Sequence, residues 1–318
     1  MRKFLKGLCI IALAVVTATT VFACESNAGK ELANKSAYNG IKTVVYGSYA
    51  QDVVTSPTLI AELEAARWVN DRAIIGLNEY ERVVAAPYRS GASFGDGTEI
   101  EEGKTYYFAV SPVNWYVLSS SSGKSVVTAE KILDVQAFNT NTETDNDGNY
   151  PNNWGMSTLR DWLNGAFYDK AFSEFDKVAI DTAKVISAYP QSFYKAHSKA
   201  IADTWDKVYA LSYAEMTDAA YKFSEEKGDY DMLRVAKVSD YARAKGAWFY
   251  IASPDEDSAD FERETFFCGA GVYWLRTVGK DISFAGVVRY NGTLGISDNY
   301  VNDLKIGVRP SMTLGFEA

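Results

Sequence analysis

Hydrophobic residues alternate with polar ones in the first and last thirds of the chain and recur at helical spacing in the middle. Alternation with a period of two residues is typical of half-buried strands. It predicts strands at residues 41–46, 105–110, 114–119, 125–128, 273–277, 284–290 and 293–297, with a less regular one at 79–88. Strands at both ends with helices between them favour an α+β fold over an alternating α/β fold.

Helical spacing is clearest after Ser157, where apolar residues recur every three or four positions as far as Phe172. Gly165 interrupts this stretch and predicts a break between two helices. Ser56 and Pro57 predict the start of another helix, because they supply an N-cap hydroxyl and the residue preferred at the first helical position.

Shorter elements are expected between these regions. Apolar spacing predicts helices at residues 213–220 and 234–244, the second one closed by Gly246. Residues 207–211 form a short apolar run that predicts a buried strand. The dipeptide Asn291-Gly292 between two strands predicts a two-residue hairpin with a type I′ turn.

The start of the chain has the layout of a secretory signal peptide. Basic residues precede an apolar run at residues 8–21, which is shorter than the roughly 20 residues that span a bilayer. The small residue Ala23 before Cys24 resembles the bacterial lipobox, in which the cysteine thiol is acylated and holds the protein on a membrane. Val21 and the bulky Phe22 depart from the usual lipobox residues, and Val21-Phe22-Ala23 also fits the small-residue rule of ordinary signal peptidase, so plain secretion remains the alternative.

We therefore expect residues 1–23 to be a signal peptide and Cys24 to be the lipidation site. This arrangement places the mature protein outside the cytoplasm, on the membrane at the bacterial cell surface. Residues 24–37 contain Leu32 as their one large apolar side chain and predict a flexible tether. No linker or repeat divides residues 38–318, which are predicted to form a single α+β domain.

Charge and cysteine content narrow the choice of partners. The chain of 318 residues has a formal net charge of −9 at pH 7, and loss of the basic signal makes the mature protein more acidic. This charge argues against nucleic acid as a partner and against charge-driven adhesion to anionic lipid. If Cys9 leaves with the signal and Cys24 carries lipid, Cys268 is predicted to be a buried free thiol with no intrachain disulfide.

The polar loop at residues 139–154 combines aromatic side chains with amides. Tyr150, Asn152, Asn153 and Trp154 are the ligand-binding candidates in this loop. Aromatic faces next to amides suit a sugar ring, which offers an apolar C–H face and hydroxyl groups. The alternative is that these aromatic side chains fold back and anchor the loop.

The same loop contains Asp145 and Asp147, which resemble part of a calcium loop and are the candidate metal ligands. An EF-hand is excluded, because Trp154 stands where that motif requires a bidentate glutamate. Calcium is thus the one cofactor under consideration, and otherwise no cofactor is expected.

No coherent catalytic set is visible in the sequence. His197 is the one histidine and has a polar setting, and Ser122-Gly123-Lys124-Ser125 lacks the first glycine of a phosphate-binding loop, so that a hairpin turn is expected there. The acidic run at residues 255–264 could supply the two carboxylates of a glycoside hydrolase. Charge runs are usually solvated, so a binding protein is favoured over an enzyme.

Ordered blocks of sequence resemble the domain-of-unknown-function family 6273. The blocks lie at residues 46–51, 113–118, 157–164, 171–173, 208–212, 240–242, 273–277, 287–293 and 307–312. The resemblance extends over about residues 41–314 and carries no assigned activity.

The pattern of this family is distantly similar to the C-type-lectin-like fold, which formylglycine-generating enzymes share. The similarity implies a small twisted antiparallel sheet flanked by two helices, with long loops forming the ligand face. It implies no activity, because the copper-binding cysteine pair and the calcium-dependent sugar motif of those proteins have no counterpart here. Arg160, Arg276 and Arg309 recur in the family's blocks and are interpreted as structural residues that hold loops through bidentate hydrogen bonds.

Together these features predict a membrane-tethered extracytoplasmic lipoprotein that acts as a non-catalytic binding or adhesion module for a glycan or a surface protein. One alternative is an envelope hydrolase or modifying enzyme that uses carboxylates. The other is a structural surface protein that has no small ligand.

Overall fold

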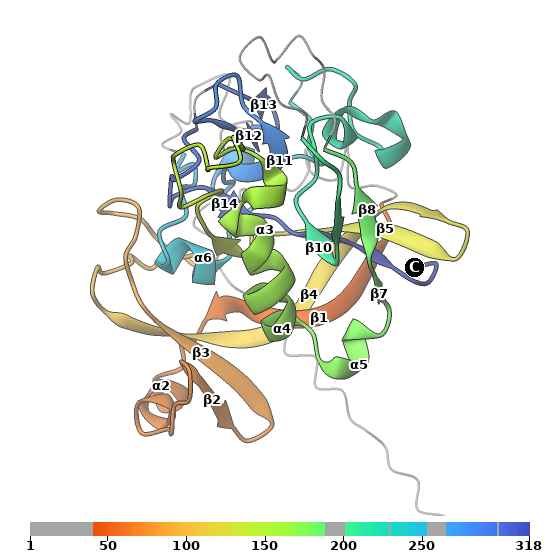
Figure 1. Ribbon diagram of the computed structural model, residues 1–318. Coiled ribbons are helices and arrows are strands. Elements are labelled where there is room, and N and C mark those ends of the chain that lie inside the picture. The colour runs from red at the N-terminus through yellow and green to blue at the C-terminus, as the bar shows by residue number, and fades with distance from the viewer. Residues whose placement is uncertain (1–40, 188–200, 229, 253–264, 298) are drawn as a thin grey trace, which may run out of the picture.

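The long strand β4 (Thr105–Ser121) runs through the centre of the main sheet of the protein (Figure 1). It pairs antiparallel with β1 (Thr43–Val53), β3 (Asn78–Val84) and β5 (Lys124–Ala129). The computed structural model describes residues 41–187, 201–228, 230–252, 265–297 and 299–318. They form a single α+β domain with 34% strand and 17% helix, as the sequence predicts.

The sequence predicts two strands where the structure has the single strand β4. Pro112 divides the two predicted segments and lies opposite Ser48 of β1. The β1 register shifts between Val45 and Ser48, so Pro112, which cannot donate a backbone hydrogen bond, lies beside an irregularity of the ladder. Gly47 in this shift has a φ of +64°, and a Cβ there would lie 2.7 Å from the carbonyl oxygen of Ala171.

Three sheets share the core of the domain. In the main sheet the order is β10-β15-β5-β4-β3-β2, with β1 on β4 and β7 on β15. Its remaining strands are β2 (Arg72–Ile75), β7 (Ile180–Asp181), β10 (Val208–Tyr209) and β15 (Ser311–Leu314). The second sheet consists of β13 (Leu294–Gly295), β12 (Ala285–Val288), β11 (Tyr273–Val278), β14 (Gly307–Val308) and β6 (Asp134–Val135). The third contains β8 (Ala183–Val185) and β9 (Thr204–Asp206).

The helix predicted at Ser56-Pro57 is confirmed as α2 (Pro57–Glu64), with Ser56 accepting a hydrogen bond from the backbone of Leu59. The break predicted at Gly165 is absent. The helix runs without interruption through α3 (Thr158–Trp162), the π-helical turn η2 (Leu163–Phe167) and α4 (Tyr168–Ala171) (Figure 1). A glycine inside a helix costs only about 1 kcal/mol of stability. Burial of the apolar face of this helix outweighs that cost.

Two other predicted helices are shorter than expected. Residues 213–220 form the 3-10 turns η4 (Glu215–Thr217) and η5 (Ala219–Tyr221) instead of one helix. Residues 234–238 are not helical, and the helix α6 (Asp240–Ala244) begins only after the cap at Ser239. Val238 is buried and forms an isolated parallel bridge with Ile132, so the apolar residues here reflect burial in the core and not one face of a helix.

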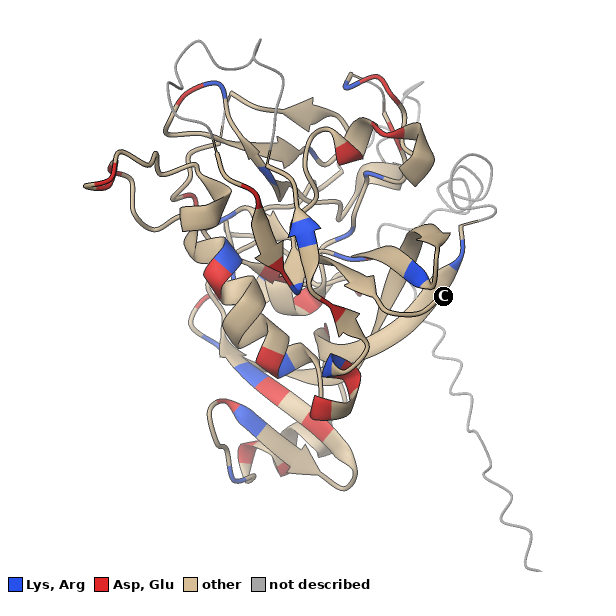
Figure 2. Cartoon of the chain, turned by 45° about the vertical axis from the view of Figure 1, so that its right-hand side comes forward, with Lys and Arg blue, Asp and Glu red and all other residues tan. Residues whose placement is uncertain are grey.

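The remaining helical elements are η1 (Trp154–Met156) and α5 (Glu174–Lys177). The hairpin turn predicted at Ser122-Gly123 is confirmed, since both residues have a positive φ between β4 and β5. In the view of Figure 2, basic and acidic residues are interspersed over the described domain.

Candidate functional site

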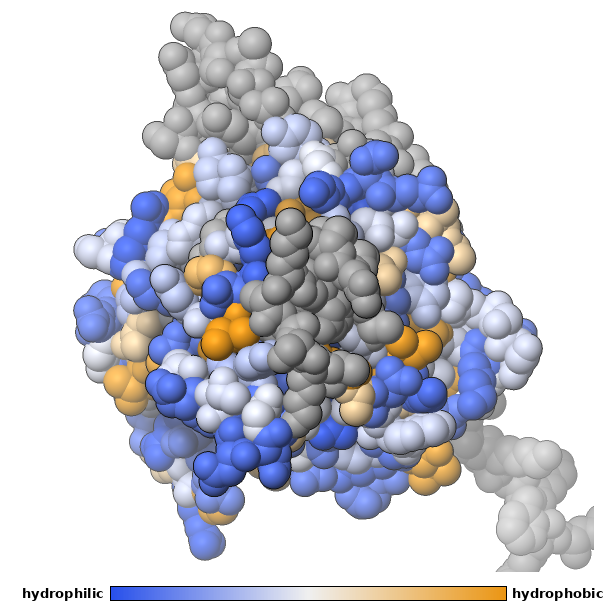
Figure 3. Space-filling model, turned by 45° about the horizontal axis from the view of Figure 1, so that its top comes forward, coloured by the Kyte–Doolittle hydropathy of each residue, from blue (hydrophilic) through white to orange (hydrophobic). Residues whose placement is uncertain are grey.

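A pocket of about 380 Å³ lies where two loops meet the β12–β13 hairpin. It is lined by Tyr213, Lys227, Gly228, Arg289, Thr293, Leu294, Gly295, Ile296 and Ser297. Tyr213 precedes η4, Lys227 and Gly228 follow η5, and the remaining residues belong to the hairpin. We call this pocket the hairpin pocket. The loop-bearing face of the molecule is largely hydrophilic, with separate hydrophobic residues among the polar ones (Figure 3).

The hairpin wall depends on a glycine. Arg289 and Thr293 close the loop through a 2.8 Å backbone hydrogen bond, and Gly292 donates to the carbonyl oxygen of Arg289 at 2.9 Å. Only Gly292 of this loop has a positive φ, so the hairpin has three loop residues and the predicted type I′ turn is wrong. The side chain of Asn291 instead accepts a 2.8 Å hydrogen bond from the hydroxyl of Thr293.

A buried arginine joins the hairpin to the loop that precedes Gly228. The guanidinium of Arg234 is fully buried and donates to the carbonyl oxygens of Glu226 and Gly292 at 3.1 and 3.5 Å, and also to that of Ser224. Lys227 accepts a 3.0 Å hydrogen bond from the backbone of Leu294. One guanidinium therefore fixes two walls of the hairpin pocket relative to each other.

Arg276 supports the third wall, which carries Tyr213. Its guanidinium lies 2.5 Å from the Glu215 carboxylate and donates to the carbonyl oxygens of Ala210 and Ile186 at 2.8 and 3.1 Å. The same carboxylate oxygen accepts a 2.7 Å hydrogen bond from the backbone of Ser212. These contacts agree with the interpretation of Arg276 as a residue that holds loops.

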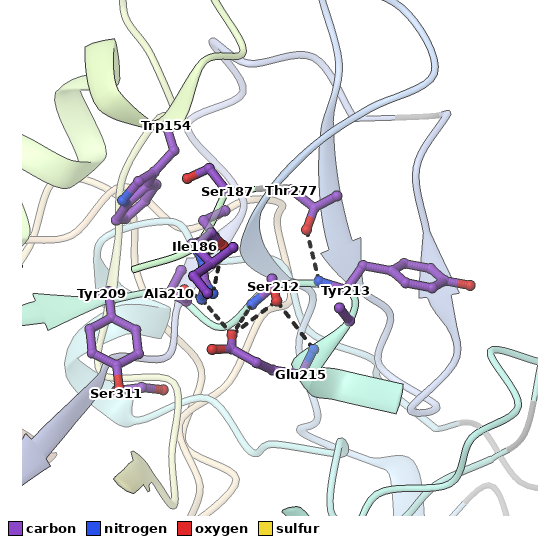
Figure 4. A network of polar contacts seen from close by, with 12 residues as sticks. Trp154, Ile186, Ser187, Tyr209, Ala210, Ser212, Tyr213, Glu215, Thr277 and Ser311 are labelled. Carbon is purple, nitrogen blue, oxygen red and sulfur yellow. Dashed lines mark hydrogen bonds and ion pairs between the residues drawn. The ribbon is translucent and has the colours of Figure 1, made fainter. Parts of the chain in front are cut away.

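The backbone of Tyr213 donates a 2.8 Å hydrogen bond to the hydroxyl of Thr277, while its ring points away from Glu215 (Figure 4). Desolvation raises the pKa of the Tyr213 phenol, Arg234 opposes this rise and Glu226 adds to it. The phenol is therefore neutral near pH 7 and can donate or accept a hydrogen bond. With two cationic side chains and two hydroxyls in the same lining, the pocket offers several groups for polar recognition.

Of the ligand-binding residues predicted from sequence, Trp154 and Asn152 are fully buried. The indole of Trp154 donates to the Asp206 carboxylate at 2.9 Å, and Arg160 approaches the other oxygen of that carboxylate at 2.7 Å. Asn152 donates to the carbonyl oxygen of Asp281 at 2.9 Å. Both residues anchor the loop, which is the alternative that the sequence left open.

Asn153 caps η1 through a 3.0 Å hydrogen bond from Gly155, and Tyr150 is half-buried. Neither residue lines the hairpin pocket. The sequence analysis did not identify Tyr213 and Arg289 as site residues, because they are far apart along the chain. Tyr213 is bonded to Thr277 of β11, and Arg289 directly follows β12, which pairs with β11.

Asp145 organises its own turn. Its carboxylate accepts hydrogen bonds from the backbones of Asp147 and Asn149 at 3.0 and 2.7 Å, and from the Asn149 amide at 2.8 Å. In the described ranges, no group of three or more His, Cys, Asp or Glu side chains is arranged to hold a metal ion. Calcium at this turn stays a prediction.

Cys268 is disulfide-bonded, so the prediction of a free thiol without an intrachain disulfide is wrong. That prediction assumed that Cys9 is removed with the signal and that Cys24 carries lipid. Four of the features discussed from the sequence lie outside the described residues, namely Cys9, Cys24, His197 and the acidic run at residues 255–264.

Among the residues that the structure describes, no helix is long and apolar enough to cross a bilayer.

Comparison with known proteins identifies a family but no relative of known activity. No curated protein and no solved structure matches the chain. The family model named "Domain of unknown function (DUF6273)" matches residues 122–316, which include every lining residue of the hairpin pocket. The expected blocks at residues 46–51 and 113–118 lie outside this match. Because the match covers more than half of the chain, the protein belongs to the DUF6273 family.

Proposed function

We propose that this protein is an extracytoplasmic, non-catalytic binding module that recognises a glycan in the hairpin pocket. The observation that carries the proposal is the pocket itself, whose three walls are fixed by the buried Arg234 and Arg276. A site that is rigid before binding loses less conformational entropy when the ligand enters. Its location in the family-matched segment makes it the candidate ligand face of the family domain.

The lining suits a sugar ring. The ring of Tyr213 offers an apolar aromatic surface to the C–H face of a sugar. Lys227 and Arg289 place cationic donors on the lining, and the hydroxyls of Thr293 and Ser297 can donate or accept. An apolar surface with a few polar groups is the usual composition of a small-molecule site.

We further propose that the fold is C-type-lectin-like. Antiparallel strands in a curved main sheet, the helix formed by α3, η2 and α4, and long loops that carry the pocket support this relationship. In this arrangement the second sheet and its loops form the ligand face. The proposal concerns the architecture alone and brings no activity with it.

We propose that the protein is exported and held on the membrane by lipid at Cys24. The basic start, the apolar run at residues 8–21 and the Ala23-Cys24 pair support this proposal. In the lipidated protein Cys9 leaves with the signal peptide and the sulfur of Cys24 carries lipid, so neither cysteine can form a disulfide with Cys268. Metabolic labelling with a fatty-acid analogue tests this, with Cys24→Ser and Cys268→Ser compared in parallel.

Label that depends on Cys24 alone would support the lipid anchor. A Cys24→Ser variant that keeps the label would overturn it. Unlabelled protein in which a peptide map joins Cys24 to Cys268 would also overturn it.

The binding function is tested by screening the purified protein on a glycan array and measuring the affinity of the strongest hit by calorimetry. Lys227→Gln should weaken binding about 5- to 10-fold, or roughly 1 kcal/mol, and Tyr213→Ala should weaken it further. Lys222→Gln is the matched control, because it removes an exposed lysine from the same region that does not line the pocket. Equal effects of both lysine variants, or turnover of the bound glycan, would contradict the proposal.

A further inference from the structure

A second pocket of about 300 Å³ lies near the N-terminal end of the described domain, outside the family-matched residues. It is lined by Val53, Val54, Thr55, Ile60, Glu64, Phe94, Asp96, Thr98, Lys104, Thr105, Tyr106 and Tyr107. We call it the α2 pocket, because α2 supplies Ile60 and Glu64. Its volume is at the small end of the range for ligand sites, which suits a small molecule and not a polymer.

The body of the α2 pocket is aromatic and aliphatic. Phe94 is buried and meets the ring of Tyr106 edge-on, with 4.9 Å between ring centroids. Trp68 stacks on the ring of Tyr107 at 5.4 Å and fixes its orientation. Val53 and Ile60 add aliphatic surface. An apolar group that enters this pocket would exchange water for these side chains.

The charged residues of the lining are predominantly acidic. Glu64, the last residue of α2, makes no ion pair with any residue that the structure describes, and Asp96 contributes a second carboxylate. Lys104 is already 2.5 Å from Glu101, so its charge is locally compensated. Burial raises the pKa of Tyr107, the charge of Glu64 raises it further and Arg82 lowers it, which agrees with the position of the Glu64 carboxylate on the same lining.

We propose that the α2 pocket binds a small organic cation, namely a primary amine carried on an aromatic or branched aliphatic body. The ammonium group interacts with the Glu64 carboxylate through a charge-assisted hydrogen bond. The ring of Tyr107 attracts cations as well as apolar groups. The ring of Tyr106 already has the Lys104 ammonium 5.2 Å from its centroid and contributes mainly apolar surface. This site is separate from the hairpin pocket and does not depend on glycan binding.

The experiment is a titration of the purified protein with 2-phenylethylamine and with its neutral analogue 2-phenylethanol, followed by NMR. The amine should bind at least tenfold more tightly than the alcohol, and Glu64→Gln should remove most of that difference. Glu62→Gln is the matched control, since it removes an exposed carboxylate of the same helix that does not line the pocket. Equal melting temperatures confirm that both variants are folded.

The proposal is overturned if the amine and the alcohol bind equally, if neither binds saturably, or if Glu62→Gln has the same effect as Glu64→Gln. Lys227→Gln must leave amine binding unchanged, because Lys227 lines the hairpin pocket and does not line the α2 pocket. A loss of amine binding in that variant would show that the amine enters the hairpin pocket, which also contradicts the proposal.

Discussion

The guanidinium of Arg276 lies 2.5 Å from the carboxylate of Glu215 and joins strand β11 to the loop that carries Tyr213. Arg276 is almost completely buried, whereas a quarter of the Glu215 side chain is exposed. Arg276 also donates to the carbonyl oxygens of Ala210 and Ile186, so the ion pair is not its only stabilising contact. The pocket wall depends on the geometry of the guanidinium, and not on its charge alone.

Arg276→Lys tests this dependence. Lysine keeps the charge but cannot reach the carbonyl oxygens of two segments at once. We expect the free energy of unfolding in urea to fall by about 2–3 kcal/mol. Arg82→Lys is the control, because Arg82 is 42% exposed in its pair with Asp71, and its loss should stay within about 0.5 kcal/mol. Similar losses in both variants would contradict the role of Arg276.

Gly292→Ala tests the hairpin. A Cβ at this position would lie 2.3 Å from the carbonyl oxygen of Asp231, and φ is +82°. Gly76 has a φ of +63° with no atom within 4 Å of its Cβ position, so Gly76→Ala isolates the conformational cost. In thermal unfolding, we expect the free energy of unfolding to fall by about 1 kcal/mol for Gly76→Ala and by about 2–4 kcal/mol for Gly292→Ala. Equal costs would show that the contact with Asp231 is unimportant.

Trp154→Phe tests whether Trp154 anchors the loop or contacts ligand. The variant leaves a buried carboxylate, that of Asp206, without one of its donors. We expect a loss of about 1–3 kcal/mol in chemical unfolding, with glycan affinity per folded molecule unchanged. Trp205→Phe changes a tryptophan that is 64% exposed and should alter stability by less than about 0.5 kcal/mol. Weaker binding by folded Trp154→Phe would restore Trp154 as a ligand residue.

Asp240 makes a specific contribution to the pH dependence of stability. Burial raises its pKa above the ordinary 3.8, although hydrogen bonds from Gly95 and Val53 oppose this rise. As pH rises, the Asp240 carboxyl loses its proton at a lower pH in the unfolded state than in the folded state. The free energy of unfolding therefore falls as pH rises from about 3.8 to the raised pKa. Asp240→Asn cannot lose this proton.

The stability of Asp240→Asn relative to the wild type should therefore increase between pH 3.5 and pH 7, measured by urea unfolding at both values. The comparison is internal, because all other carboxylates are common to the two proteins. A difference that stays constant or decreases with pH would show that burial does not dominate at Asp240.

Local signals in the sequence predicted the elements that depend on a few neighbouring residues. Ser56-Pro57 marked the start of α2, and Ser122-Gly123 marked the β4–β5 turn, because caps and turns are determined by local backbone chemistry. The prediction failed at Pro112 and Gly165. There, a bulge in a partner strand and burial of a helix face outweighed the local preference.

The candidate site could not be predicted for a related reason. Tyr213, Lys227 and Arg289 come from three segments that are far apart in the sequence, and the buried Arg234 and Arg276 help to hold those segments together. The family resemblance identified Arg276 as structural but gave no information on what it supports. Polar loops with aromatic residues drew attention to Trp154, whose ring is instead in the core.

The central claim is that the hairpin pocket is the ligand site, and the most direct measurement is an NMR titration of the purified protein with the strongest glycan hit. The account predicts that shifts in backbone amide resonances concentrate at the lining residues Gly228, Thr293 and Gly295, and that Asn152 and Trp154 remain unchanged. Shifts concentrated at Asn152 and Trp154, or at the α2 pocket, would contradict it.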